Sequence, residues 1–165
     1  MEPSLSDIDL RDYFWIARDR TPLLFSGVRM VAPIIRRLCT DLLGDNVGDQ
    51  QVAAKQVVDL SGEDLDALLK ELSSHVRRNP GDQSGPRALL LLADYDIPNS
   101  VSTLTSSLGM VRIEDIPPNV MRDLGTLVKT KPDTREMVVP FLRRAAADVD
   151  TPTGRAAKQA LEELS

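Results

Sequence analysis

The sequence predicts an all-α protein in which antiparallel helix pairs stack side by side. Apolar residues recur at spacings of three and four along most of the chain, and capping residues or prolines interrupt them at short intervals. No alternating run of β-branched residues predicts a strand. Helices of this kind bury one face each and need neighbours to complete a core. The eight or nine expected helices span about 8–19, 22–43 (with a break near Ser26-Gly27 as the alternative), 48–60, 62–78, 86–94, 99–108, 118–130, 134–147 and 152–164.

The helix expected at 62–78 has the clearest boundaries. The Ser61 hydroxyl can accept a hydrogen bond from a free amide of the first turn, and the acids that follow suit the positive end of the helix. Asn79-Pro80-Gly81 ends it, because proline has no amide to donate. Between these limits the apolar residues fall on one face: Leu65, Leu68, Leu69, Leu72 and Val76.

Proline and glycine mark other helix boundaries. At the first helical position the missing amide of proline is harmless and its fixed φ suits the helix. This predicts helix starts at Thr21-Pro22, Pro117-Pro118 and Thr151-Pro152. Gly44 and Gly109 are expected to end helices in the left-handed conformation, which glycine adopts without strain. Residues 110–116 are expected to form a loop.

Composition and charge set broad limits on function. With 165 residues, of which 42% are apolar and 27% charged, the chain is expected to form a single helical domain over 1–165. The net charge of −5 argues against non-specific binding to nucleic acid, which depends on excess Lys and Arg. The lone cysteine, Cys39, lies in an apolar run and is expected to be a buried, unreactive thiol.

Neither a secretory signal nor a membrane span is visible in the sequence. The first ten residues carry Glu2, Asp7 and Asp9 in place of a basic start and an apolar run. No stretch approaches the roughly 18 consecutive apolar residues of a spanning helix. The expected location is therefore the cytoplasm, and no membrane partner is expected.

Two distant segments of the chain are similar to each other. Residues 30–37 read Met-Val-Ala-Pro-Ile-Ile-Arg-Arg, and residues 137–144 read Met-Val-Val-Pro-Phe-Leu-Arg-Arg. Each is followed by a loop and then by Ala-Ala-Lys-Gln, at 53–56 and at 156–159. The pattern predicts a repeated helical hairpin in which an internal proline bends the first helix and alanines let the second pack closely. Chance similarity among common helix residues is the alternative.

This layout resembles the HEAT-repeat family, in which the first helix often holds a proline and the second has a core of the Arg-x-x-Ala type. Residues 154–161, Gly-Arg-Ala-Ala-Lys-Gln-Ala-Leu, fit that second helix best, whereas residues 62–130 do not follow the pattern cleanly. The resemblance therefore covers roughly a third of the chain. It implies a HEAT- or ARM-like α-α superhelix that serves as a scaffold.

The sequence offers no assembled set of catalytic, cofactor-binding or metal-binding residues. It has neither a Gly-x-x-x-x-Gly-Lys-Ser/Thr loop for phosphate nor a Gly-x-Gly-x-x-Gly turn after a strand. The only histidine, His75, is expected to lie on a helix surface. Asp7 with Asp9, and Asp94 with Asp96, provide too few oxygens for a hard cation. The chain is accordingly expected not to be an enzyme and to need no cofactor.

Aromatic and basic residues are the candidates for contact with a partner. In Tyr13-Phe14-Trp15, three consecutive aromatics cannot all face one core, so Tyr13 and Trp15 are candidate docking residues. A helix wedged between two neighbours would explain the same cluster. The other candidates could form a basic ridge for an acidic protein or a phosphate backbone, although cations also suit the late turns of a helix. They are Arg36, Arg37, Arg143 and Arg144.

The stretch 10–20, which reads Leu-Arg-Asp-Tyr-Phe-Trp-Ile-Ala-Arg-Asp-Arg, resembles one found downstream of the nucleotide-binding domain in bacterial KAP-type P-loop ATPases. Some of these ATPases are associated with phage-defence operons. The later part of the chain, through residues 156–159, is similar in style to their helical tail. The resemblance implies that the chain is a C-terminal fragment of a larger ATPase. No nucleotide-binding residue carries over, because the phosphate-binding loop is absent.

The function expected from these observations is that of a non-catalytic helical scaffold that binds a protein partner. The resemblance to KAP-type ATPases implies that the partner is another domain of the parent chain, in a system of the phage-defence type. A nucleic-acid-binding helical domain that uses the Arg-Arg pairs is the alternative, and the acidic net charge makes it the weaker one.

Overall fold

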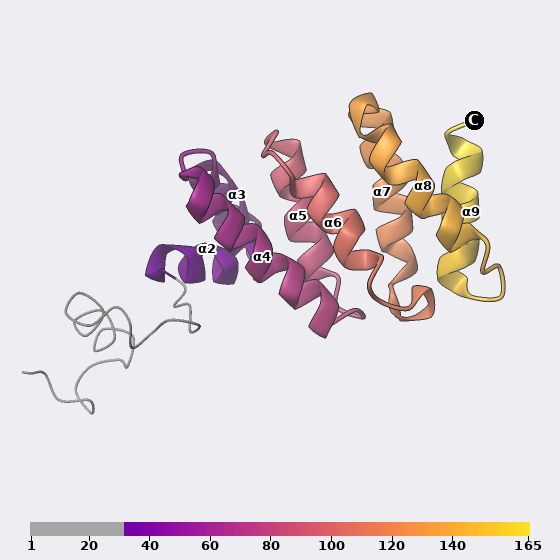
Figure 1. Ribbon diagram of the computed structural model, residues 1–165, viewed down its shortest axis with the longest axis horizontal. Helices are drawn as coiled ribbons and strands as arrows, with labels where there is room; N and C mark the ends of the chain where they lie inside the picture. The colour runs from indigo at the N-terminus through magenta and orange to yellow at the C-terminus, as the bar shows by residue number, and fades with distance from the viewer. Residues whose placement is uncertain (1–31) are drawn as a thin grey trace, which may run out of the picture. The chain divides into compact units, whose positions relative to one another are not determined.

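The amphipathic segments of the sequence form a two-layered array of helices in the computed structural model (Figure 1). The structure describes residues 32–165, and residues 34–165 form one compact unit. Within the described residues there is no strand, which confirms the predicted all-α class. The helices are α2 (Pro33–Leu43), α3 (Val47–Val57), α4 (Gly62–Arg78), α5 (Ser84–Asp94), α6 (Ser100–Leu108), α7 (Pro118–Thr130), α8 (Arg135–Ala146) and α9 (Pro152–Glu163), with short 3₁₀ helices η2 (Ile113–Asp115) and η3 (Pro132–Thr134).

Alternate helices of the chain make up each layer. In the first layer α4 packs against α6, and α6 against α8. In the second layer α3 packs against α5, α5 against α7, and α7 against α9. Because consecutive helices are antiparallel, α4, α6 and α8 run in the same direction (Figure 1). This arrangement confirms the predicted stack of antiparallel helix pairs.

The hydrophobic core lies between the two layers. On α4 the predicted apolar face is buried from Leu68 to Val76, with Leu65 partly exposed at its edge. Burying a leucine side chain stabilises a fold by about 2 kcal/mol, so this shared interior is the main source of cohesion between the layers. The largest fully buried side chains are Ile35, Leu38, Leu42, Leu68, Leu72, Leu89, Leu92, Leu104, Leu108, Ile116, Met121 and Leu124.

The predicted helix starts at Ser61 and Thr151 are confirmed. The Ser61 hydroxyl accepts from the Asp64 amide at 3.2 Å, and the Thr151 hydroxyl accepts from the Gly154 amide at 2.9 Å. Proline occupies the first position of α7 and of α9, as expected from its fixed φ. Thr21-Pro22, like the helix expected at 8–19, lies outside the described residues.

The helix ends expected at Gly44 and Gly109 are confirmed, because α2 ends at Leu43 and α6 at Leu108, but the left-handed conformation expected of these glycines is wrong. Gly109 has φ −66, and its amide bonds to the Thr105 carbonyl, so the end of α6 continues in right-handed turns. Gly44 also lies outside the left-handed region. Positive φ occurs instead at Asp96 (58) and Asn99 (66), in the turn between α5 and α6. Short polar side chains of this type tolerate the left-handed conformation by bonding locally.

The helix predicted over 22–43 is wrong at Ala32, which is not helical, and α2 begins at Pro33. Proline suits that first position because it has no amide to lose. Pro140, by contrast, lies inside α8. The two prolines of the similar segments therefore occupy different helix positions. The alanine pairs of these segments are alike, since Ala53, Ala54, Ala156 and Ala157 are all buried.

Candidate functional site

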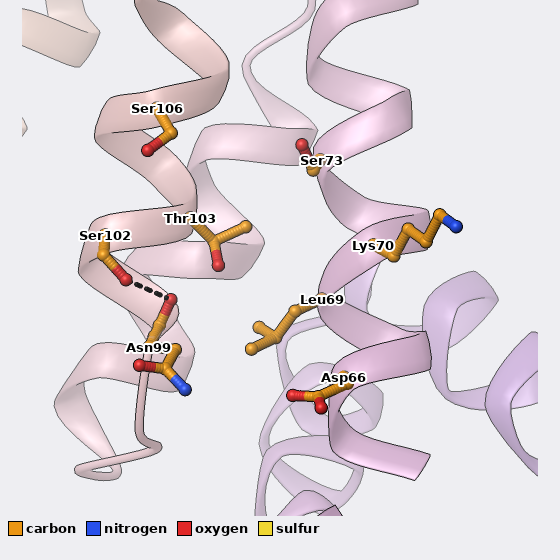
Figure 2. A pocket seen from close by; sticks show the side chains of 8 residues that line it. All are labelled: Asp66, Leu69, Lys70, Ser73, Asn99, Ser102, Thr103 and Ser106. Atoms are coloured by element: carbon orange, nitrogen blue, oxygen red, sulfur yellow. Dashed lines mark hydrogen bonds between the residues drawn. The ribbon is translucent and has the colours of Figure 1, made fainter. Parts of the chain in front are cut away.

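An open groove of about 340 Å³ lies between α4 and α6, on the outer side of the first layer (Figure 2). Its two walls come from neighbouring parallel helices that are distant in sequence. One wall is formed by α4, and the other by α6 with the residue that precedes it. The lining residues are Asp66, Leu69, Lys70, Ser73, Asn99, Ser102, Thr103 and Ser106.

The composition of α6 explains why its wall of the groove is polar. Its nine residues read Ser-Val-Ser-Thr-Leu-Thr-Ser-Ser-Leu, and the apolar positions Val101, Leu104 and Leu108 face the core. Helical spacing then places Ser102, Thr103 and Ser106 along the groove, whereas Ser100 and Ser107 are buried. Beside the groove, the hydroxyls of Ser73 and Ser107 are 2.6 Å apart and join the two helices by a hydrogen bond.

Several polar groups of the groove have no partner within the described part of the chain. The Ser102 hydroxyl donates to the Asn99 carbonyl at 3.1 Å, so that hydroxyl is engaged. The Asn99 side chain does not cap α6, although this residue directly precedes the helix. No hydrogen bond engages the side-chain amide of Asn99 or the hydroxyls of Thr103 and Ser106 in residues 32–165. These groups are free to bond a ligand.

The charge that faces the groove is negative. Asp66 and Lys70 are four residues apart on α4, a spacing at which oppositely charged side chains often pair. They make no ion pair, and among residues 32–165 neither has another charged partner. Figure 2 shows the Asp66 carboxylate directed towards α6 and the Lys70 amine directed away from it. The methylene stem of Lys70 borders the groove, whereas its charge lies outside.

Acidic residues also predominate around the beginnings of α4, α6 and α8, which lie at one edge of the first layer. Lys131 and the exposed Arg135, which begins α8, are exceptions there. Lys131 binds the Asp96 carboxylate, and this hydrogen bond raises the pKa of the Lys131 amine. We call this set the acidic edge, and its acids are Asp59, Glu63, Asp64, Asp66, Asp94, Asp96, Asp133 and Glu136.

The four arginines predicted to contact a partner are all exposed, but they lie on separate parts of the surface. Arg36 and Arg37 belong to α2, whereas Arg143 and Arg144 belong to α8, with α4 and α6 between these helices (Figure 1). Arg37 donates to the Gln56 side chain at 3.2 Å, and the Arg144 guanidinium lies 5.5 Å from the centre of the Phe141 ring. Tyr13 and Trp15 lie outside the described residues.

His75 stabilises the turn between α4 and α5 by hydrogen bonds. Its Nε2 atom is 3.3 Å from Asp82 Oδ2 and 3.2 Å from Ser84 Oγ. A catalytic relay needs separate partners on the two ring nitrogens, whereas here one nitrogen meets both. Asp82 also accepts from the Ser84 amide at 2.9 Å, and the bonds from Ser84 lower the pKa of the Asp82 carboxyl. The cluster is therefore explained by the turn that it stabilises.

Cys39 is half-buried rather than fully buried, which corrects the expectation from its apolar run. Burial, helped by the negative charge of Glu71, raises the pKa of its thiol to about 12. At neutral pH the thiol is protonated and hence a poor nucleophile. Within residues 32–165, no three His, Cys, Asp or Glu side chains gather in a way that could hold a metal ion.

A second hollow, of about 540 Å³, lies along α9 and the loop before it. The Arg155 guanidinium, which lines it, donates to the carbonyls of Val149 and Asp150. Both bonds come from one terminal nitrogen of the guanidinium, Nη1. The other lining residues are Lys158, Gln159 and Glu162, and their side chains are exposed. This hollow lies along one helix and its preceding loop, whereas the groove between α4 and α6 has two facing walls.

Comparisons with family models, with curated proteins and with solved structures find no match to this chain. Within the part of the chain that the structure describes, no helix combines the length and apolar character needed to cross a membrane.

The residues of the groove were not among those predicted from the sequence to contact a partner. They are common surface residues and form no motif, so they become distinctive only when α4 and α6 lie side by side. One signal was present, because α6 is rich in serine and threonine, which are poor helix formers. A hydroxyl-rich helix in the middle of an apolar stack suggests a surface with a purpose other than packing.

Proposed function

We propose that this chain is a non-catalytic helical scaffold that binds an extended segment of a protein partner in the groove between α4 and α6. The observation that carries this proposal is a set of polar groups that have no partner within residues 32–165, on Asp66, Asn99, Thr103 and Ser106, arranged around the apolar side chain of Leu69. Binding sites combine such free hydrogen-bonding groups with apolar contact.

The shape and chemistry of the groove favour a peptide over a small molecule. Sites for small molecules are mostly enclosed and lined by apolar and aromatic side chains. This groove is open and lined by hydroxyl groups, one amide and one carboxylate. An extended peptide presents both N–H and C=O groups along its length, and hydroxyl and amide side chains can bond to either kind. Leu69, at 4% exposure, adds a small apolar contact at the base.

The ionisable groups of the groove support a binding role over a catalytic one. Neither His75 nor Cys39 lines the groove, and among the described residues that line it the ionisable ones are Asp66 and the outward-directed Lys70.

The resemblance of residues 10–20 to a stretch in KAP-type ATPases supports a proposal about the identity of the partner. The partner segment would then belong to another domain of a larger ATPase, for which this chain serves as the accessory domain.

The nucleic-acid-binding alternative finds less support. Arg36-Arg37 and Arg143-Arg144 lie on separate helices with α4 and α6 between them, and the groove in that interval carries a carboxylate. A phosphate backbone following this layer would meet negative charge where it needs cations.

Filling the groove tests the proposal. Ser106 is exposed on the groove wall, so Ser106→Tyr should keep the fold while it occupies the space. Peptides selected from an unbiased displayed library on the wild-type protein are expected to bind Ser106→Tyr at least about tenfold more weakly in calorimetric titrations, since the bulky ring displaces the bound segment.

Thr126→Tyr provides the matched control, because Thr126 is an exposed hydroxyl residue on α7, outside the groove. This variant is expected to bind the selected peptides as the wild type does. Far-UV circular dichroism and thermal unfolding would check that both variants fold. Equal affinity of Ser106→Tyr and Thr126→Tyr for every selected peptide would place the binding site elsewhere and refute the proposal, as would failure to select any peptide.

A further inference from the structure

We infer that the groove recognises an arginine or lysine side chain of the bound segment, with the Asp66 carboxylate as its charge partner. The inference rests on the proposed function and specifies its ligand. Asp66 faces the groove across from α6 (Figure 2), and no described cation neutralises it. Asp66 is exposed, and a cation that arrives with the ligand can replace the water around its carboxylate by a charge-assisted hydrogen bond.

The groups around Asp66 also match a long basic side chain. The hydroxyl of Thr103 and the side-chain carbonyl of Asn99 can accept hydrogen bonds from a guanidinium or ammonium head, and both are unengaged in residues 32–165. Leu69, at 4% exposure, adds only a small apolar contact for the methylene stem of such a side chain at the base of the groove. Figure 2 shows Leu69 and Thr103 directed into the space between the helices.

Other ligand charges fit less well. An acidic side chain in the groove would lie beside Asp66 and near the remaining carboxylates of the acidic edge, and like charges at close range repel. Lys70 does not relieve this repulsion, because its amine is directed away from α6. A neutral ligand would displace water from the Asp66 carboxylate without supplying an opposite charge. The acidic edge in addition attracts a basic segment at longer range and speeds its association.

Two labelled peptides test the inference. One carries Arg-Ala-Arg within a flanking Gly-Ser sequence, and the other has Gln-Ala-Gln in the same place. Fluorescence anisotropy is expected to show binding of the arginine peptide to the wild type and about fivefold weaker binding to Asp66→Asn, as expected for a partly exposed charge pair. The glutamine peptide is expected to bind weakly and to be insensitive to Asp66→Asn.

Asp59→Asn is the matched control for charge. Asp59 is an exposed acid in the turn before α4 and does not line the groove, so its loss removes the same charge from the acidic edge. Affinity for the arginine peptide is expected to stay within about twofold of wild type. Equal weakening by Asp66→Asn and Asp59→Asn would show that the acidic edge acts diffusely and overturn the inference. Equal binding of the two peptides, or no binding of the arginine peptide, would also overturn it.

The library selection separates this inference from the proposed function. If selected peptides bind Ser106→Tyr more weakly than the wild type, but contain no basic residue and bind Asp66→Asn normally, the charge inference fails. The proposal that the groove binds a peptide then still holds. If selected peptides contain arginine or lysine, lose affinity for Ser106→Tyr and lose it for Asp66→Asn, both hold. If they bind Ser106→Tyr normally, the proposed function itself fails.

Discussion

Replacing Gly154 by alanine is expected to destabilise the protein by about 3 kcal/mol or to prevent its folding. Gly154 lies in the first turn of α9, where this helix folds back tightly against the end of α8. A Cβ atom there would lie 1.7 Å from the Asp148 carbonyl oxygen and 3.0 Å from the Ala145 carbonyl oxygen. These are backbone atoms, which cannot rotate away as a side chain would. The loop between α8 and α9 would have to open.

Gly62→Ala is the control for this substitution. Gly62 is the first residue of α4, and a Cβ there would meet nothing within 4 Å. Because alanine favours helix more than glycine does, this variant is expected to be unchanged or more stable by up to about 1 kcal/mol. Urea unfolding followed by far-UV circular dichroism would measure both variants. Equal unfolding free energies for the two would contradict the described geometry of the α8–α9 turn.

Leu104→Ala is expected to lower the free energy of unfolding by about 3 kcal/mol, within the range found for buried leucines. Leu104 lies on α6 with no exposed surface, so truncation removes buried apolar atoms and leaves a cavity between the layers. The helix that carries Leu104 also forms one wall of the groove. The same variant is therefore expected to weaken peptide binding, since its groove wall is held less firmly.

Met110→Ala controls for the general effect of removing apolar atoms from this region. Met110 follows α6 and is 70% exposed, so its truncation is expected to change the unfolding free energy by less than about 0.5 kcal/mol. Chemical denaturation of both variants under the same conditions makes the comparison. A loss below about 1 kcal/mol for Leu104→Ala would show that α6 is not packed into a shared core.

The helices whose limits were predicted best are those with explicit boundary chemistry. Ser61 and Thr151 each supply a side-chain acceptor to a first-turn amide, and that local geometry needs no tertiary context. The start of α2 at Pro33 was missed, because the apolar pattern continues on both sides of the proline. Gly109 was assigned a left-handed cap that it does not adopt, since α6 ends in right-handed turns whose direction depends on the loop that follows.

The candidate site could not be predicted, because it depends on which helices are neighbours. Ser73 and Ser107 are 34 residues apart and become hydrogen-bonded only when α4 lies beside α6. No spacing rule within one helix reveals such a pairing. The arginine pairs drew attention because repeated charges stand out in a sequence. In the fold they lie on separate helices, and the groove is formed by residues that are individually unremarkable in sequence.

Mapping amide chemical shifts during titration with a selected peptide would test the central claim most directly. With isotope-labelled protein, we expect the perturbed amides to cluster on residues 66–73 of α4 and on residues 99–106, in α6 and just before it, which form the two walls of the groove. Perturbations confined to α2 or to the hollow along α9, with both groove walls unchanged, would contradict it.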